Sequence, residues 1–595
     1  MKLSGLLFAA ALLGSCTQPA AEENYTRHVD PKIGTGGHGH VFVVANVPFG
    51  LVQVGPTSIP QTWDWCSGYH ASDSTVIGFS HTHLSGTGIG DLFDITVMPV
   101  VGEVTYARGE ENDPASGLWS YADRTREITK PGYYSVPLVR YGITAELTAT
   151  ERVGLHRYTF PASDAAAVVF DLENGGCWDK ATDTGFRFSD DSTRIAGWRC
   201  STGWAKNQEV YFVAEFSKPA KGISYLQPGE IDDSKMPRIA ARYARVDFDT
   251  AEGEQVLVKV ALSPVSIEGA KANLAAELPG WDFDATAAAA DKAWNDELSK
   301  VKIETEDETS KRIFYTALYH TMVAPSLFCD VNGDYRGADG KVHENPGRDT
   351  YTTFSLWDTY RAAMPLMTVL HPERMPDIIQ TMLHIADEQG RLPVWHLWGN
   401  ETDCMVGNPG IVAVADAIVK GIGGFDREKA FETIRKTAMN PDRGNGLRME
   451  YGYIPCEMFN EAVAYDMEYA LADGAAARAA EALGKAEDAK YFEERSHSYR
   501  NYFDPQTGFM RGRDSRKGWR TPFNAFASTH RADDYCEGNA WQYTWLAPHD
   551  VKGLEGLFGS RAKMIEKLDS LFTVSSVIEG GETSPDISEI GRAHV

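Results

Sequence analysis

The chain has 595 residues, of which 43% are hydrophobic, 24% charged and 11% aromatic, a composition that excludes disordered and collagen-like proteins. Its formal net charge of -26 at pH 7 repels phosphate backbones and excludes the clustered basic surface of a nucleic-acid binder. The length predicts roughly two or three domains.

The first residues have the pattern of a bacterial secretion signal. Lys2 is followed by an apolar run to Leu13 and then by Gly14, Ser15 and Cys16. This ending resembles a lipobox, so we expect residues 1–16 to be cleaved before Cys16 and Cys16 to be acylated. Residues 17–28 are then a tether, and the protein is anchored to the outer membrane, in the periplasm or at the cell surface. An ordinary signal peptide with an incidental cysteine is the alternative.

Residues 29–265 are predicted to form an antiparallel β-sandwich. Short β-rich runs are separated by Gly, Pro, Asp and Ser, and many such strands over this length favour a large sandwich. The clearest run, 209–216, alternates strictly and places four apolar residues on one face: Val210, Phe212, Ala214 and Phe216.

The pattern changes to helices after Pro264. A helical linker is predicted at 266–303, followed by a helical domain at 304–588 whose loops are rich in Trp, Asn, Asp and Gly. Long helices alternating with such loops suggest an (α/α)6 toroid with a pocket at one end. The predicted helices are residues 285–298, 310–322, 355–370, 376–387, 411–420, 427–439, 459–472, 475–483, 486–503, 539–546 and 561–571.

Several common chemistries lack the motifs that they need. The eight cysteines include no CxxC pair, which argues against a zinc site built on thiolates. The glycine-rich stretch 34–39 has no GK[ST] ending, and neither GxSxG nor HExxH occurs. Carboxylates among aromatic residues remain as the candidates for chemistry.

The first such group is SLWDTYR at 355–361. On a helix, Asp358 and Arg361 are neighbours at i, i+3, and Trp357 and Arg361 at i, i+4. A sugar can stack on the indole while its hydroxyls bind the acid and the guanidinium. The alternative is a surface ion pair beside a core tryptophan.

The second group lies in a loop at 392–408. Trp395, Asn400, Glu401 and Asp403 are crowded there between predicted helices, and loops of this composition usually serve binding. A structural cap for the next helix is the alternative.

The third group is at 535–545. Glu537, Trp541 and Trp545 fall at i, i+4, i+8, so we expect a carboxyl group held against indole rings, which raises its pKa as a general acid requires. The alternative is a carboxylate at a helix N-terminus beside core tryptophans.

The N-terminal part adds two HxH pairs, His38 with His40 and His81 with His83. Each pair lies on one face of a strand and could bind a metal, but neither has a third ligand at fixed spacing, so hydrogen-bonded structural or pocket-lining histidines are favoured. A polar and aromatic cluster that could bind a glycan follows the first pair: Trp63, Asp64, Trp65 and Tyr69.

Several motifs, in order along the chain, together resemble the glycoside hydrolase family 92 α-mannosidases, in particular those that are lipoproteins of Bacteroidetes-type bacteria. The motifs are VDPKIGTGGHGH at 29–40, VPFG at 47–50, GFSHTHLSGTG at 78–88, SLWDTYR at 355–361, GNETDCMVGNP at 399–409, EGNAWQY at 537–543 and GETSPD at 581–586. The resemblance implies a β-sandwich followed by an (α/α)6 catalytic domain, calcium as cofactor, and hydrolysis of terminal α-mannosides of N-glycans or mannans with inversion.

The resemblance also implies roles for individual residues. Glu537 matches the general acid, and calcium is expected to hold the sugar's O2 and O3. By motif, five residues are expected to line or support the mannose pocket: Trp357, Asp358, Asn400, Glu401 and Asp403. The other residues expected to bind substrate are Trp63, Trp65, Tyr69, Arg361, Trp395, Trp541 and Gln542.

The sequence departs from the family pattern in two places. Residues 41–45 read VFVVA where the family has TFPGA, and two later segments, HGNEPSHH-like and GNDDxGQMSAWY-like, are not found. In the family the second of these supplies the catalytic base and much of the calcium site, so we assign neither a base nor metal ligands.

We therefore expect the toroid to be truncated at its C-terminus and poorly packed in its C-terminal half, and we expect this chain to be inactive. Residues 589–595 are expected to be a non-native tail, because 590–595 can be encoded by the start of a common sequencing adapter. A different class, a noncatalytic surface glycan-binding lipoprotein, is the alternative function.

Overall fold

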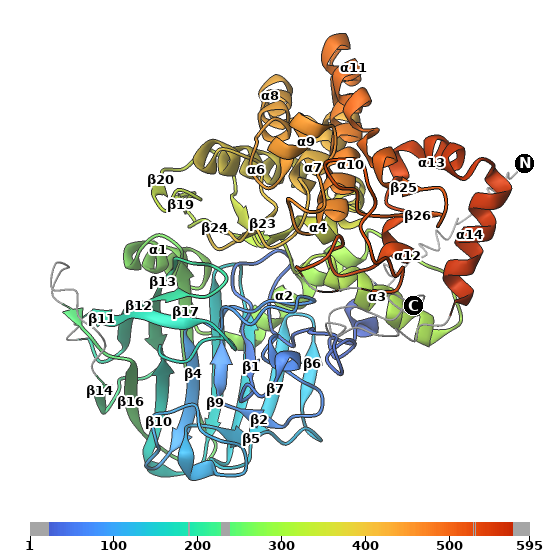
Figure 1. The fold of residues 1–595 in the computed structure, drawn as a ribbon. Helices are drawn as coiled ribbons and strands as arrows, with labels where there is room; N and C mark the ends of the chain where they lie inside the picture. Colours follow the sequence, from blue (N-terminus) through green and yellow to red (C-terminus); the bar gives the residue numbers. More distant parts are fainter. Residues whose placement is uncertain (1–22, 188–190, 228–237, 528, 530, 575–595) are drawn as a thin grey trace, which may run out of the picture.

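The computed structural model describes residues 23–574 apart from 188–190, 228–237, 528 and 530. The predicted signal peptide with Cys16, the first half of the tether, the 581–586 motif and the 589–595 tail lie outside the described residues. A β-sandwich formed by the first half of the chain is followed by a helical domain that lies against one end of it (Figure 1). Within the described ranges, no helix combines the length and apolar character that crossing a bilayer requires.

Two antiparallel sheets form the predicted sandwich. The six-stranded sheet has the order β1 (Gly55–Thr57), β3 (Gly78–Ser80), β4 (Thr96–Val101), β10 (Ser163–Asp171), β16 (Tyr243–Thr250) and β14 (Gly222–Leu226). The nine-stranded sheet has the order β15 (Arg238–Ile239), β11 (Lys180–Arg187), β12 (Arg194–Thr202), β13 (Gln208–Phe216), β17 (Glu254–Ser263), β9 (Val153–Phe160), β8 (Ile143–Ala149), β7 (Tyr133–Leu138) and β6 (Ile128–Lys130).

The core of the sandwich lies between these sheets. The alternation predicted for β13 is confirmed, since its inward residues are all buried: Val210, Phe212, Ala214 and Phe216. Phe212 stacks on Phe170 of the opposite sheet, with ring centroids 5.9 Å apart. Residues on the inner faces of two packed sheets meet in this way.

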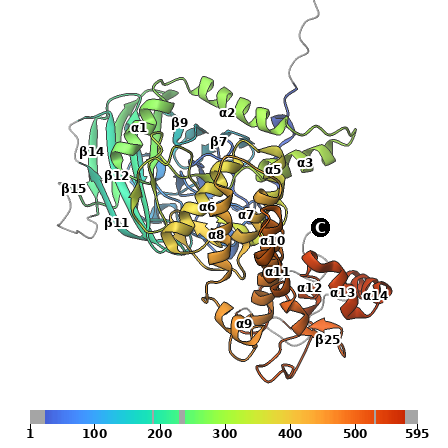
Figure 2. The same cartoon turned by 90° about the horizontal axis from the view of Figure 1, so that it is seen from above.

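Three helices join the two domains (Figure 2). The helix α1 (Ile267–Glu277) packs Ile267, Ala270 and Leu274 on the outer face of the nine-stranded sheet. In α2 (Phe283–Leu298), the buried Trp294 donates through Nε1 to the carbonyl of Asn46 over 2.7 Å. The helix α3 (Glu308–His320) follows and leads into the helical domain.

Small sheets and longer helices make up the helical domain. The small sheets are β18 (Ser326–Leu327) with β21 (Tyr351–Thr352), β19 (Tyr335–Arg336) with β20 (Val342–His343), β22 (Phe354–Ser355) with β23 (Trp395–Leu397) and β24 (Asn400–Glu401), and β25 (Phe503–Asp504) with β26 (Phe509–Met510). The helices are α4 (Leu356–Thr359), α5 (Ala363–Leu370), α6 (Met375–Gln389), α7 (Pro409–Val419), α8 (Arg427–Ala438), α9 (Asn445–Tyr451), α10 (Ala462–Ala482), α11 (Ala486–Arg495), α12 (Ala540–Tyr543), α13 (Val551–Phe558) and α14 (Arg561–Thr573).

Four predicted helices differ from those observed. The prediction of one helix over 355–370 was wrong, because Pro365 cannot donate to the carbonyl of Arg361 and its ring clashes there, so α4 ends and α5 begins anew. The predictions over 459–472 and 475–483 merge into α10, where Gly474 is covered by the ring of His549. The helix predicted over 539–546 is only the four-residue α12.

Candidate active site

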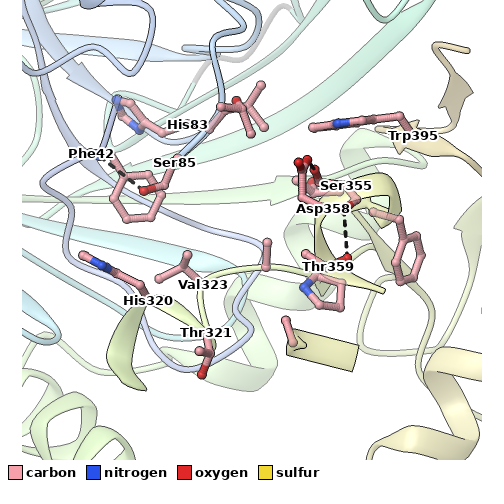
Figure 3. Close-up of a pocket in the computed structure, with 18 of the residues that line it drawn as sticks. Phe42, His83, Ser85, His320, Thr321, Val323, Ser355, Asp358, Thr359 and Trp395 are labelled. Carbon is pink, nitrogen blue, oxygen red and sulfur yellow. Dashed lines mark hydrogen bonds between the residues drawn. The ribbon is translucent and has the colours of Figure 1, made fainter. Parts of the chain in front are cut away.

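A cavity of about 300 Å³ lies between the sandwich and the helical domain. Phe42, His83 and Ser85 line it from the sandwich side, and Asp358 and Trp395 line it from the helical side (Figure 3). Two of the predicted binding residues, one from each of two separate motifs, are thus brought together.

Asp358 lies on the short α4, where Ser355 donates its hydroxyl to Asp358 Oδ2 over 2.5 Å. The strand β22 that precedes α4 pairs with β23, with Ser355 opposite Trp395. This pairing brings the first two predicted groups side by side.

The other side chains around α4 converge on Glu468, a buried carboxylate of α10. Trp357 donates through Nε1 over 3.0 Å, the Tyr360 hydroxyl over 2.8 Å and the Arg361 guanidinium over 2.7 Å. Burial raises the pKa of Glu468, while Arg361 acts in the opposite direction. Arg361 and Trp357 therefore have a shared anchor that the i, i+4 argument did not foresee.

Sequence reasoning missed Glu468 because its partners lie more than 100 positions away. The helix α10 carries two further buried acids, Asp466 and Asp473, so its acidic residues did not single out Glu468 in the sequence. A buried charge in such a helix requires a partner from elsewhere.

The first part of the predicted loop at 392–408 is a hairpin formed by β23 and β24. The side chain of Glu401, a residue of β24, stabilises this hairpin through backbone hydrogen bonds. The Glu401 carboxylate accepts hydrogen bonds from the backbone N–H groups of Val394, Trp395 and Asp403, at 2.8, 2.9 and 3.0 Å. Its contacts therefore support the pocket wall.

Asp403 follows β24, in the loop that we call the hairpin loop (402–408), and lies between two arginines. It pairs with Arg391 and lies 3.6 Å from Arg443 Nε. Arg443 also donates to the carbonyls of Met405 and Gly407. Asp403 is thus tied to the framework of the loop.

Glu537 lies just before α12 and is half-buried, with φ +46. Because this backbone is left-handed, Glu537 is outside the helix, and the predicted stripe of Glu537, Trp541 and Trp545 was wrong. Burial raises the pKa of the Cys404 thiol, and the negative charge of the Glu537 carboxylate adds to that rise.

The remaining residues of this motif are structural in their contacts. Trp541 packs edge-on against Phe509, with centroids 4.8 Å apart, and Trp545 stacks on Phe558. Gln542 accepts from the backbone N–H of Asn539 and completes a capping box at the start of α12.

The long helix α10 supports all three predicted groups. Glu468 holds α4, and Gly407 of the hairpin loop lies so close that an added β-carbon would be 2.4 Å from the side chain of Glu468. At the residue that precedes α10, the backbone N–H of Glu461 donates to the carbonyl of Asp533 over 2.6 Å, which ties the segment before Glu537 to the helix.

Asp533 and Asp534, the acids nearest to Glu537 in the sequence, are both engaged. Asp533 accepts from the backbone N–H groups of Thr529 and Tyr535, and Asp534 pairs with Arg520 at 2.7 Å. Burial raises the pKa of Asp533 to about 6. Neither contact pattern singles out a catalytic base.

The three aromatic residues of the sandwich that were predicted to bind sugar lie in different environments. Trp63 donates through Nε1 to Gly88, in the segment that lines the cavity, and His40 meets its ring edge-on at 4.1 Å. Trp65 donates to Asp73. Tyr69 is 3% exposed and its hydroxyl donates to Glu127, so it lies in the domain interior.

The favoured interpretation of the second HxH pair is confirmed. His81 Nδ1 bonds to the Ile95 carbonyl and its Nε2 lies 2.9 Å from His156 Nε2 in the core. His83 bonds to the Gln53 carbonyl over 2.8 Å and lines the cavity. Burial lowers the pKa of His83 to about 4.

A cluster of Glu297, His371 and Glu373 could hold a metal ion by spacing. However, Lys300 Nζ already lies 2.8 Å from Glu297, 3.0 Å from Glu373 and 3.2 Å from His371. Calcium takes six to eight oxygen ligands. A site with two carboxylates, an imidazole and an ammonium group does not fit it.

A β-sandwich joined to a helical domain, with Trp395 and Asp358 lining the cavity where the two meet, matches the architecture expected for a glycoside hydrolase. The chain belongs to glycosyl hydrolase family 92. Residues 28–263 match that family's N-terminal domain and residues 269–589 its catalytic domain.

Known relatives agree with this assignment. A family GH92 α-mannosidase from Bacteroides thetaiotaomicron, in complex with mannoimidazole, is 38% identical over 93% of this chain and 74% of its own, with a TM-score of 0.88. A GH92 inverting mannosidase from Bacteroides thetaiotaomicron VPI-5482 is 30% identical over 93% of this chain and 75% of its own, with a TM-score of 0.82. An uncharacterized secreted glycosidase from Arthroderma benhamiae is 26% identical over 97% of this chain and 78% of its own.

Proposed function

We propose that this glycoside hydrolase is an inverting exo-α-mannosidase that acts on terminal α-mannosides of N-glycans or mannans. Two similar family 92 structures carry the names α-mannosidase and inverting mannosidase. The observation that carries the proposal is the convergence of α4, the loop after β24 and the segment before Glu537 on α10. Asp358 of α4 and Trp395 of β23 line the interdomain cavity.

In this proposal, Glu537 protonates the glycosidic oxygen as the bond to the anomeric carbon breaks. Inversion requires a second carboxylate that activates a water molecule on the opposite face of the sugar. We assign no described residue to that role.

Calcium is proposed as a cofactor from the family resemblance alone. When bound, it would polarise sugar hydroxyls as a Lewis acid. The one metal-like cluster found among the described residues does not fit calcium, so no step is assigned to it.

The test uses α-1,2-, α-1,3- and α-1,6-linked mannobioses with calcium or with a chelator, comparing the wild type with Glu537→Gln. We expect mannose release that falls by at least about 100-fold in the variant, the usual contribution of a general acid. Binding of mannobiose without any hydrolysis in the wild type would instead favour a glycan-binding protein.

We also propose that the protein is secreted and lipid-anchored through Cys16, which lies outside the described residues. The secreted fungal relative supports export, and the lipobox pattern supports the anchor. Incorporation of labelled palmitate by the wild type but not by Cys16→Ala tests the anchor. Equal labelling of both would contradict it.

A further inference from the structure

The turn at 203–207 connects β12 to β13 and reaches from the sandwich to the wall of the candidate site. Trp204 meets Trp395 edge-on, with ring centroids 5.2 Å apart. Trp395 in turn lines the interdomain cavity. One indole thus supports another that lines the cavity.

The same turn is joined to the hairpin by Asn400. The backbone N–H of Asn207 donates to Asn400 Oδ1, and Asn400 Nδ2 donates to the Asn207 carbonyl, both over 3.1 Å. Asn400 Nδ2 also donates to the carbonyl of Trp398 over 2.8 Å. An asparagine amide has two N–H groups, so these bonds use both of its donors.

A buried network fixes the base of the turn. Asp91, fully buried, accepts the N–H of Ala205 over 2.9 Å, and an added β-carbon on Gly203 would lie 2.6 Å from the Asp91 carboxylate. Beside it, Asp94 accepts from Arg199 at 2.6 Å and from Gln208 at 2.5 Å.

Rigidity of this kind matters for the hairpin, since β23 and β24 have three and two residues. They form one small three-stranded sheet with the two-residue β22, and a sheet of this size gains stability by packing against neighbouring elements. The hairpin therefore depends on contacts from outside, and the turn supplies an aromatic contact and a two-way amide contact.

We propose that the 203–207 turn is a positioning element of the sugar site, in which Trp204 and Asn400 hold Trp395 in place across the domain boundary. Asn400 acts through the turn, and its donors are committed to protein carbonyls. This proposal rests on the proposed mannosidase function for the identity of the sugar.

The test compares Trp204→Ala and Asn400→Ala with Trp204→Phe, which keeps an aromatic edge, and with Lys206→Ala, an exposed change in the same turn. Two quantities are measured on the full chain: hydrogen exchange of the amides at 395–401, and calorimetric binding of mannoimidazole. An aromatic pair of this kind corresponds to about a 2- to 10-fold change.

We expect amide exchange at 395–401 to accelerate by that factor in Trp204→Ala and Asn400→Ala, with weaker binding and unchanged exchange in β12 and β13. Trp204→Phe should keep most of the slow amide exchange and most of the mannoimidazole binding of the wild type, and Lys206→Ala should match the wild type in both measurements. Unchanged exchange at 395–401, or unchanged binding despite faster exchange, would overturn the positioning role. If the wild type binds no mannoimidazole, the mannosidase proposal fails, and the exchange data still decide whether the turn holds the hairpin.

Discussion

Replacement of Glu468 by alanine removes the anchor of α4. The substitution leaves the Tyr360 hydroxyl and the Trp357 indole N–H without their acceptor, and it leaves Arg361 without its counter-charge. Tyr360 is only 5% exposed, so water cannot readily replace that acceptor. Removing one partner of a buried ion pair costs about 3–5 kcal/mol. Because the Arg361 side chain is 41% exposed and can be hydrated, we expect the lower half of that range, about 3–4 kcal/mol.

Urea unfolding followed by circular dichroism measures this loss of stability directly. Glu481→Ala, on the same helix but in an exposed pair with Arg478, is the matched control and should change stability by less than about 0.5 kcal/mol. Glu468→Gln should fall between the two, because its amide oxygen can still accept from Tyr360. A Glu468→Ala protein within about 1 kcal/mol of the wild type would refute the reasoning.

Further predictions concern the loop, the cavity and the sandwich interior. Gly407→Ala should destabilise by about 1–3 kcal/mol more than Gly421→Ala in thermal melts, because both have φ near +75 but only the first β-carbon meets a neighbour, Glu468 at 2.4 Å; equal losses would contradict this. Burial lowers the pKa of His83 from 6.5 to about 4, so the unfolded chain binds more protons between these values and stability falls as the pH falls through them. His83→Gln should remove about 2 kcal/mol of the wild-type loss between pH 7 and pH 5, and parallel pH profiles would argue against a buried neutral imidazole. Tyr69→Phe should cost about 1–2 kcal/mol in urea unfolding yet leave mannoimidazole binding unchanged, whereas weakened binding would support the sugar contact predicted from sequence.

The sandwich could be predicted from sequence because its signal is local. Alternation in β13 repeats every two residues, and the side chains on its inner face are the apolar ones. The order of sandwich and helical domain followed from the same periodicities. The closure of the helices into a toroid stays a prediction.

The site was predicted only in part, because its contacts depend on residues far apart in sequence. Asp358 and Trp395 meet at the cavity as expected. The stripe through Glu537 failed because helical spacing was applied to a residue with a left-handed backbone. Glu468 and Trp204 were missed because their partners come from other elements, and no local pattern marks them.

The most direct test of the central claim is product analysis with azide, a small anion that can attack the anomeric carbon where no base activates water. As the azide nitrogen bonds to that carbon, the glycosidic bond breaks and Glu537 delivers its proton to the leaving oxygen. With mannobiose and azide, we expect the wild type to form β-mannosyl azide and Glu537→Gln to form at least about 100-fold less. Formation of α-mannosyl azide, or equal yields from both proteins, would contradict inversion with Glu537 as the acid.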